Sequence, residues 1–249
     1  MRLFLHELRA QQRLFWRSHE AAFFTFLFPI VLLLLLGFVY GDEEIEGVKG
    51  SSYLVAGLLG YGVVATAFAG LAISLVVRRE SGVLKRVRGT PLPPVVYLGA
   101  VIASTLVVVA LQALGQILIG HYVLDADLPA SPAGLALALL LGVSAFAALG
   151  LAVTGVVRSA EGSSAIVNAI YLPLTFVSGT FFSVHALPRF LEAIAEVFPL
   201  THLLELVRGF FLGGDAFRTS PGAVAALALW GGAGVVLALR TFKWEPRES

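Results

Sequence analysis

The run AAFFTFLFPIVLLLLLGFVY, residues 21–40, contains no Asp, Glu, Lys or Arg. A helix of about 20 apolar residues, rising 1.5 Å per residue, crosses the ~30 Å hydrocarbon core of a bilayer. Pro29 lies inside the run, and neighbouring helices can satisfy the carbonyl group that a proline leaves free in such a helix. The run therefore predicts a membrane-spanning helix.

Further uncharged runs of similar length follow this first one. They cover residues 53–77, 95–124, 133–157, 165–182 and 222–239. The composition agrees, because 58% of the residues are hydrophobic and only 13% are charged, where a soluble domain carries roughly a quarter. The predicted fold is an all-α integral membrane protein with six transmembrane helices in a single domain, residues 1–249.

Lysine and arginine are distributed unevenly between the predicted loops. With the N-terminus in the cytoplasm, most of the 17 basic residues fall in the inner segments. The outer segments then keep only Lys49, Arg189, Arg208 and Arg218. Positive residues are enriched on the cytoplasmic side of membrane proteins. We therefore expect a multi-pass protein of the cell (inner or plasma) membrane with both termini in the cytoplasm.

The segment before the first span, residues 1–20, has the pattern of an amphipathic helix. At 100° per residue its apolar side carries Phe4, Leu5, Leu8, Phe15 and Trp16, and its other side carries Arg2, Arg9, Arg13 and Arg17. A basic face opposite aromatic residues is typical of a helix that lies in the headgroup layer. We expect such an interface helix; a solvated helical extension is the alternative.

Two other segments do not fit a simple alternation of spans and loops. Residues 78–94 are basic, contain a short helical stretch and end in prolines, so they form either a functional element or an ordinary positive loop. Residues 183–221 are too polar for a span and too apolar for a solvated loop. They predict two short amphipathic helices, at 188–198 and 201–212, which are re-entrant or interfacial on the outer side because each is too short to cross.

The sequence lacks the motifs of most enzymes. It has no phosphate-binding loop, no G-x-S-x-G or H-E-x-x-H motif and no cysteine, and its five histidines are scattered. We therefore expect no catalytic site and no metal site on this chain. The spans carry a few polar residues that could line a substrate path or form hydrogen bonds between helices. The candidates are Gln112, Gln116, Asn168 and Thr175.

Two stretches resemble a known family. RESGVLKRVRGTPLPPVVYLGA, residues 79–100, is similar to the R-E-x-G-T-L-x-R-L-x-x-T-P segment of ABC-2-type exporter permeases. Residues 171–211 resemble the P-x-x-F-x-S-G-x-F-F-P, L-P, P-L-T and R-G landmarks of the same family, with Ser183-Val184 in place of the proline and Val83 in place of the threonine. The resemblance extends over essentially the whole chain and is strongest to the daunorubicin-resistance branch, which serves multidrug export.

The resemblance implies partners for this chain. Family members work as two permease copies, a homodimer by default or a heterodimer, with two copies of a separate ATPase subunit that binds ATP and Mg. Residues 78–94 would then form the coupling segment that docks into the ATPase, with the contacts Arg79, Glu80, Lys85, Arg86 and Arg88. The segment after the fifth span would form an outer gate that contains Phe181, Phe182, Pro188, Pro199 and Arg208.

The function expected from the resemblance is that of a permease subunit of an ATP-driven exporter. It would move an amphipathic small molecule or a lipid-like substrate out of the cytoplasm or the inner leaflet. Export of a lipid-linked polysaccharide is the alternative within transport, and a membrane anchor or immunity protein with a permease fold is the alternative outside it. No nucleic-acid partner is expected. The sequence leaves the substrate open.

Overall fold

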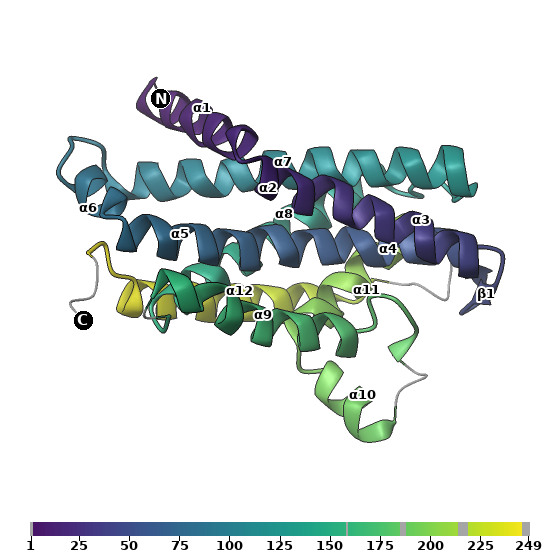
Figure 1. Cartoon of the computed structure of the whole chain (residues 1–249). Coiled ribbons are helices and arrows are strands. Elements are labelled where there is room, and N and C mark those ends of the chain that lie inside the picture. Colours follow the sequence, from purple (N-terminus) through teal and green to yellow (C-terminus); the bar gives the residue numbers. More distant parts are fainter. Residues whose placement is uncertain (1, 158, 185–187, 214–218, 246–249) are drawn as a thin grey trace.

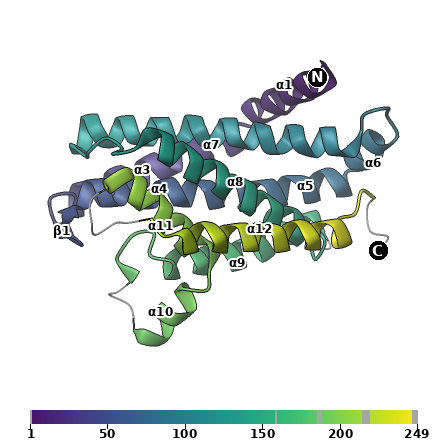
Figure 2. The same cartoon turned by 180° about the vertical axis from the view of Figure 1, so that it is seen from behind.

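Long helices that lie roughly parallel to one another make up most of the chain in the computed structural model (Figure 1; Figure 2). The structure describes residues 2–157, 159–184, 188–213 and 219–245. One end of the bundle carries the short helix α6 (Val83–Arg88) together with both chain termini, and the other end carries a small hairpin (Figure 1). These two places are called the α6 end and the hairpin end below.

Within the described ranges, five helices are long and apolar enough to cross a membrane. They confirm a multi-pass membrane protein, and they correspond to the predicted first, second, third, fourth and sixth spans. The first is His19–Tyr40, built from α2 (His19–Ala22), a π-helical segment η1 (Phe23–Leu27) and α3 (Phe28–Tyr40). The second is Gly50–Glu80, built from α4 (Gly50–Val63), the π-helical segment η2 (Val64–Gly70) and α5 (Leu71–Glu80). The others are α7 (Pro94–Leu124), α8 (Pro132–Thr154) and α12 (Pro221–Thr241).

The predicted fifth span has different bounds in the structure. Residues 165–182 were expected to be helical, but the helix, α9, runs over Ala160–Val177 and is not among the five. It begins early because the Ser159 side chain accepts a hydrogen bond from the Gly162 N–H and caps the helix. It ends early because the chain turns at Gly179, whose φ of 81° lies in the left-handed region.

Pro29 is accommodated by a local change of helix type. A proline ring inside a helix clashes with the carbonyl group four residues earlier and cannot donate to it. In the structure Pro29 is the second residue of α3, one residue after the π-helical segment Phe23–Leu27 ends. The wider π turn lets the helix continue across the proline, so the predicted span is continuous.

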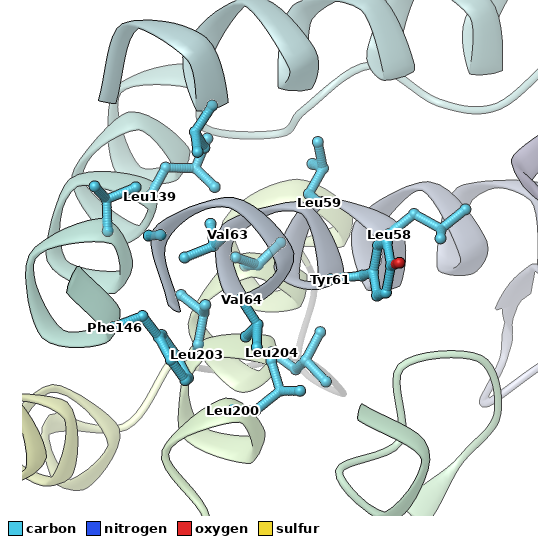
Figure 3. Close-up of a cluster of buried hydrophobic side chains, with 14 of the residues drawn as sticks. Leu58, Leu59, Tyr61, Val63, Val64, Leu139, Phe146, Leu200, Leu203 and Leu204 are labelled. Carbon is cyan, nitrogen blue, oxygen red and sulfur yellow. The ribbon is translucent and has the colours of Figure 1, made fainter. Parts of the chain in front are cut away.

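The helix Gly50–Glu80 lies at the centre of the bundle. Figure 3 shows Val63 and Val64 of this helix, both buried, next to labelled side chains of α8 and α11. Close approach depends on small residues, because a Cβ atom at Gly57 would lie 1.9 Å from the Thr180 carbonyl oxygen. The central helix therefore contacts its neighbours partly through its backbone.

The N-terminal segment is helical, as predicted: α1 covers Arg2–Arg17. It packs beside α7, where the Gln12 side-chain amide donates to the hydroxyl and the carbonyl of Ser104, at 3.0 Å each. The predicted apolar side is only partly used, because Leu5 and Trp16 stay exposed. The side of α1 that faces the bundle is instead the side that carries Gln11, which is buried.

The two short helices predicted between residues 188 and 212 are present as α10 (Arg189–Ala195) and α11 (Pro199–Leu212). They differ in environment. α11 is inserted against α4 and α8 with Leu200, Leu203 and Leu204 buried (Figure 3). α10 stands away from the bundle (Figure 1; Figure 2), and its apolar residues Phe190 and Ile194 are exposed.

A short antiparallel hairpin, absent from the all-α prediction, precedes the central helix. β1 (Glu44–Ile45) pairs with β2 (Val48–Lys49). The turn between the strands has φ of 51° at Glu46 and 79° at Gly47, and two such consecutive residues are typical of a tight hairpin turn. The strands are too short to be recognised from residue alternation.

Candidate functional site

The helix α6 is presented at one end of the bundle by a tight turn after α5. Gly82 has a φ of 72° and precedes α6, so the chain reverses within two residues of Glu80. On the inner side of α6, Leu84 is completely buried in an apolar cluster that includes Leu75 of α5 and Tyr97 of α7. The cluster fixes the orientation of α6 relative to the central helix.

The outer side of α6 is basic. Lys85, Arg86 and Arg88 are all exposed, and we call them the basic face of α6. The Arg88 guanidinium lies 3.7 Å from the carboxylate of Glu245, and both side chains are mostly exposed. Of the five predicted docking residues, these three are therefore available to a protein partner.

Arg79 requires a correction. It was expected to face a partner, but its side chain is 1% exposed. Its guanidinium donates to the carbonyl oxygens of Thr154 (2.7 Å) and Val157 (2.8 Å), and its Nε donates to Glu80 (2.8 Å). The Thr154 carbonyl belongs to the last residue of α8 and the Val157 carbonyl lies just after it, at a helix end where the dipole favours a cation. Arg79 therefore holds α5 to α8, and Glu80 is only partly accessible.

Arg78, the neighbour of Arg79, connects three helices at the same end of the bundle. Its guanidinium donates to Gln11 of α1 at 2.6 Å and to the Tyr97 hydroxyl of α7 at 3.1 Å. The sequence offered a weak signal for this link, since Gln11 is a polar residue within the apolar sector of an amphipathic helix. The link joins α1 to the base of α6.

The residues predicted to line a substrate path do not meet in one place. Gln112 and Gln116 are buried on α7, where the Gln112 side-chain oxygen accepts from Thr66 at 3.3 Å. Thr175 is buried on α9 and donates to the carbonyl of its own helix, and Asn168 is half-buried on the same helix. In this conformation Gln112 occupies the contact between α7 and the central helix, where it lies against Gly62 and Thr66.

Arg208, predicted as part of an outer gate, is buried at the hairpin end. Its guanidinium carbon lies 4.0 Å from the centre of the Tyr53 ring, and its NH2 group donates to the Gly179 carbonyl. The ring belongs to α4 and the carbonyl to the turn after α9. Arg208 therefore connects α11, the central helix and this turn.

The other predicted gate residues are distributed over the same region. Phe181 lies against Tyr61 and Phe176, with ring centroids 6.3 and 5.5 Å apart. Pro199 is buried at the start of α11, whereas Phe182 and Pro188 are exposed. The structure thus brings Phe181 and Arg208 to the central helix, and it leaves Phe182 and Pro188 on the surface.

An apolar cavity of about 330 Å³ opens between α8, α9 and α12. Its lining includes Val153, Tyr171, Leu174 and Trp230, and almost all of the lining surface is carbon. The indole N–H of Trp230 is engaged with the Val197 carbonyl at 3.0 Å. Such a cavity suits an apolar group and offers no charged partner for a polar one.

At the hairpin end, Lys49 and Asp125 form an ion pair of 2.7 Å. The hydrogen bond from Lys49 lowers the pKa of Asp125 below its ordinary value, and the same bond raises the pKa of Lys49. Nearby, the Ser52 hydroxyl donates to Asp127 at 2.8 Å. Together these bonds attach the end of α7 and the following loop to the start of the central helix.

Two comparisons with known proteins bear on these features. The family model described as "ABC-2 type transporter" matches residues 2–212. The chain is also similar to the Bacillus subtilis (strain 168) protein named "Putative transport permease YvfS". The two are 24% identical over 205 residues, which is 80% of this chain and 83% of that protein.

Proposed function

Since this chain belongs to the ABC-2 type transporter family, we propose that it is the transmembrane permease subunit of an ATP-driven exporter. The observation that carries the proposal is the basic face of α6, which is exposed on the outside and anchored by the buried Leu84 on the inside. A short helix held in this way transmits force from a bound partner into the helices behind it. The partner would be a separate ATPase subunit that supplies ATP and Mg.

The proposed docking surface consists of Lys85, Arg86 and Arg88, with Glu80 at its margin. Three cationic side chains on one short helix fit an acidic groove, and rim charges of this kind direct a partner to its site and set the orientation. Arg79 is left out because its side chain is enclosed. Two permease copies and two ATPase copies would form the working assembly.

We further propose six membrane crossings, with α9 as the fifth. α9 has 18 residues and so reaches about 27 Å at 1.5 Å per residue, close to the ~30 Å hydrocarbon thickness. With six crossings both termini lie on the same side as α6, which would be the cytoplasm. α10 and α11 would then lie on the outer side, as interfacial and re-entrant helices.

The proposed substrate is an amphipathic small molecule or a lipid-like molecule. The cavity between α8, α9 and α12 supports a substrate with an apolar group, because the lining of the cavity has almost no polar surface. It lies between helices that a bilayer would surround, so an apolar molecule could enter it from the lipid. Movement would be outward from the inner leaflet.

The test is removal of charge from the basic face of α6. The triple variant K85Q/R86Q/R88Q is reconstituted into liposomes with the ATPase subunit that co-purifies with the parent chain. We expect loss of ATPase association and of transport, with unchanged thermal unfolding in detergent because all three side chains are exposed. The matched control is R2Q/R9Q/R13Q, which removes three exposed charges from α1 at the same end of the bundle. Native transport by the α6 variant would show that the docking assignment is wrong.

A further inference from the structure

Residues 242–245 follow α12, and we call them the strap; its Phe242 and Trp244 pack against the apolar cluster that holds Leu84 of α6. α12 ends at Thr241, where the Phe242 backbone becomes extended. The Thr241 hydroxyl lies 2.8 Å from the Leu237 carbonyl of its own helix and 3.3 Å from the Ala152 carbonyl of α8. The start of the strap is therefore fixed relative to α8.

The strap is held by aromatic packing. The Trp244 ring lies 6.0 Å from the Tyr97 ring and 5.2 Å from the Phe242 ring, the latter edge to face. Phe242 and Trp244 pack against the same apolar cluster that buries Leu84 of α6. Aromatic rings at these separations attract one another in addition to the effect of burying their area. Trp244 thus contacts the support on which α6 rests.

The polar end of the strap lies on the same surface as the basic face of α6. The Glu245 carboxylate is 3.7 Å from the Arg88 guanidinium, and the two side chains are about 60% exposed. An exposed ion pair of this length contributes little to stability. The pair matters because it places a carboxylate next to Arg88, on the surface that a partner of α6 would cover.

We infer that the strap and α6 form one composite docking surface, in which Glu245 contacts the ATPase and Trp244 connects the docked surface to α12. This inference rests on the proposed function. The partner surface would combine an acidic groove, for Lys85 and Arg86, with a neighbouring cationic or hydrogen-bond-donating group that faces Glu245.

The connection through Trp244 has a mechanical consequence. α6 already follows α5 and the central helix through the Gly82 turn. The strap adds a second route, through α12, whose residues Trp230 and Leu237 line the apolar cavity. A displacement of α6 would therefore reach the cavity by two routes, through α12 and through the central helix, whose Phe68 also lines the cavity.

The absence of cysteine from the sequence allows a direct test, since one introduced thiol is then the only one. Single variants E245C, K85C and D125C are labelled with a maleimide, with and without the bound ATPase subunit and with non-hydrolysable ATP. Asp125 is the control because it is exposed and pairs with Lys49 of the hairpin, which lies at the opposite end of the bundle from α6 (Figure 1). We expect labelling to slow several-fold at positions 245 and 85 and to stay unchanged at 125.

The outcomes separate the two proposals. Protection at 85 without protection at 245 overturns the composite surface and leaves the docking function intact. Lack of protection at both positions overturns both.

A second variant tests the mechanical route. W244A should bind the ATPase but transport several-fold less substrate per ATP hydrolysed, and W244F should recover most of the loss. The control is L239A, which removes an exposed apolar side chain from the same end of α12. Unchanged transport per ATP in W244A would overturn the role of Trp244, as would an equal loss in L239A.

Discussion

Replacing Arg79 by alanine should destabilise the protein and leave the proposed docking surface on α6 unchanged. The side chain is 1% exposed, and its guanidinium donates to two carbonyls at the end of α8. Hydrogen bonds that involve a charged group contribute about 1.5–3 kcal/mol each. The Arg79–Glu80 contact adds less, because Glu80 is partly solvated.

The net magnitude follows from what alanine leaves behind. Two buried carbonyls lose their donors and a large side chain leaves a cavity, while the cost of burying a cation is relieved. We expect a loss of roughly 3–5 kcal/mol in the free energy of unfolding for R79A. R79K keeps the charge but cannot reach both carbonyls with a planar fork, so it should lose roughly half as much.

The assay is equilibrium unfolding in mixed detergent and SDS micelles, followed by helical circular dichroism. The control is R86A, an exposed residue for which the change should stay within about 0.5 kcal/mol. Association with the ATPase subunit, measured where both variants are folded, should be retained in R79A and weakened in R86A. The structural role of Arg79 is refuted if R79A unfolds like the parent chain and loses the ATPase as R86A does.

Two further predictions concern the helix packing and the hairpin end. G57A places a Cβ atom 1.9 Å from the Thr180 carbonyl oxygen and should lower the free energy of unfolding by roughly 1–3 kcal/mol. The control G115A adds a Cβ atom in open space and should be close to neutral; equal effects of the two variants in the same unfolding assay contradict the close approach at Gly57. The lowered pKa of Asp125 means that the Lys49–Asp125 pair stabilises the fold above the ordinary carboxyl pKa and that this stabilisation is lost as the pH falls through the lowered value. The difference in melting temperature between D125N and the parent should therefore persist down to about pH 5 and shrink as the pH falls below the ordinary carboxyl pKa; a difference that is unchanged on acidification contradicts it.

The spans were predictable because the bilayer excludes charged residues. This rule does not take helix caps into account. It gave the five long helices but misplaced α9, where Glu161 excluded the true start and the uncharged residues 178–182 extended the end. Helix caps decide such boundaries. Ser159 and Gly179 are the residues that carry this information, and both are common enough elsewhere to be weak signals in isolation.

The exposed basic face of α6 was predictable as a group, but the position of each basic residue was not. A run with alternating basic and apolar residues indicates an amphipathic element, and Leu84 and Arg86 indeed take opposite sides. Arg79 belongs to the preceding helix, and its burial depends on where α8 ends, seventy-five residues later in the chain. A contact of that kind follows from tertiary packing and leaves no local pattern.

The position of the strap was also missed, although the sequence held a signal. Phe242 and Trp244 flank a lysine directly after the last span, a combination that is typical of an interfacial anchor. The structure shows that the same rings pack against protein. Aromatic residues at a span end therefore have two explanations, and only packing distinguishes them.

The central position of the helix Gly50–Glu80 has a consequence for biogenesis. Membrane helices form in lipid first and associate afterwards. The side of this helix near Gly60 contacts Leu200 and Leu204, which are synthesised about 140 residues later. Until α11 arrives, lipid chains or a chaperone must cover that side, so the most enclosed helix of the finished protein is among the first to be inserted and the last to be completed.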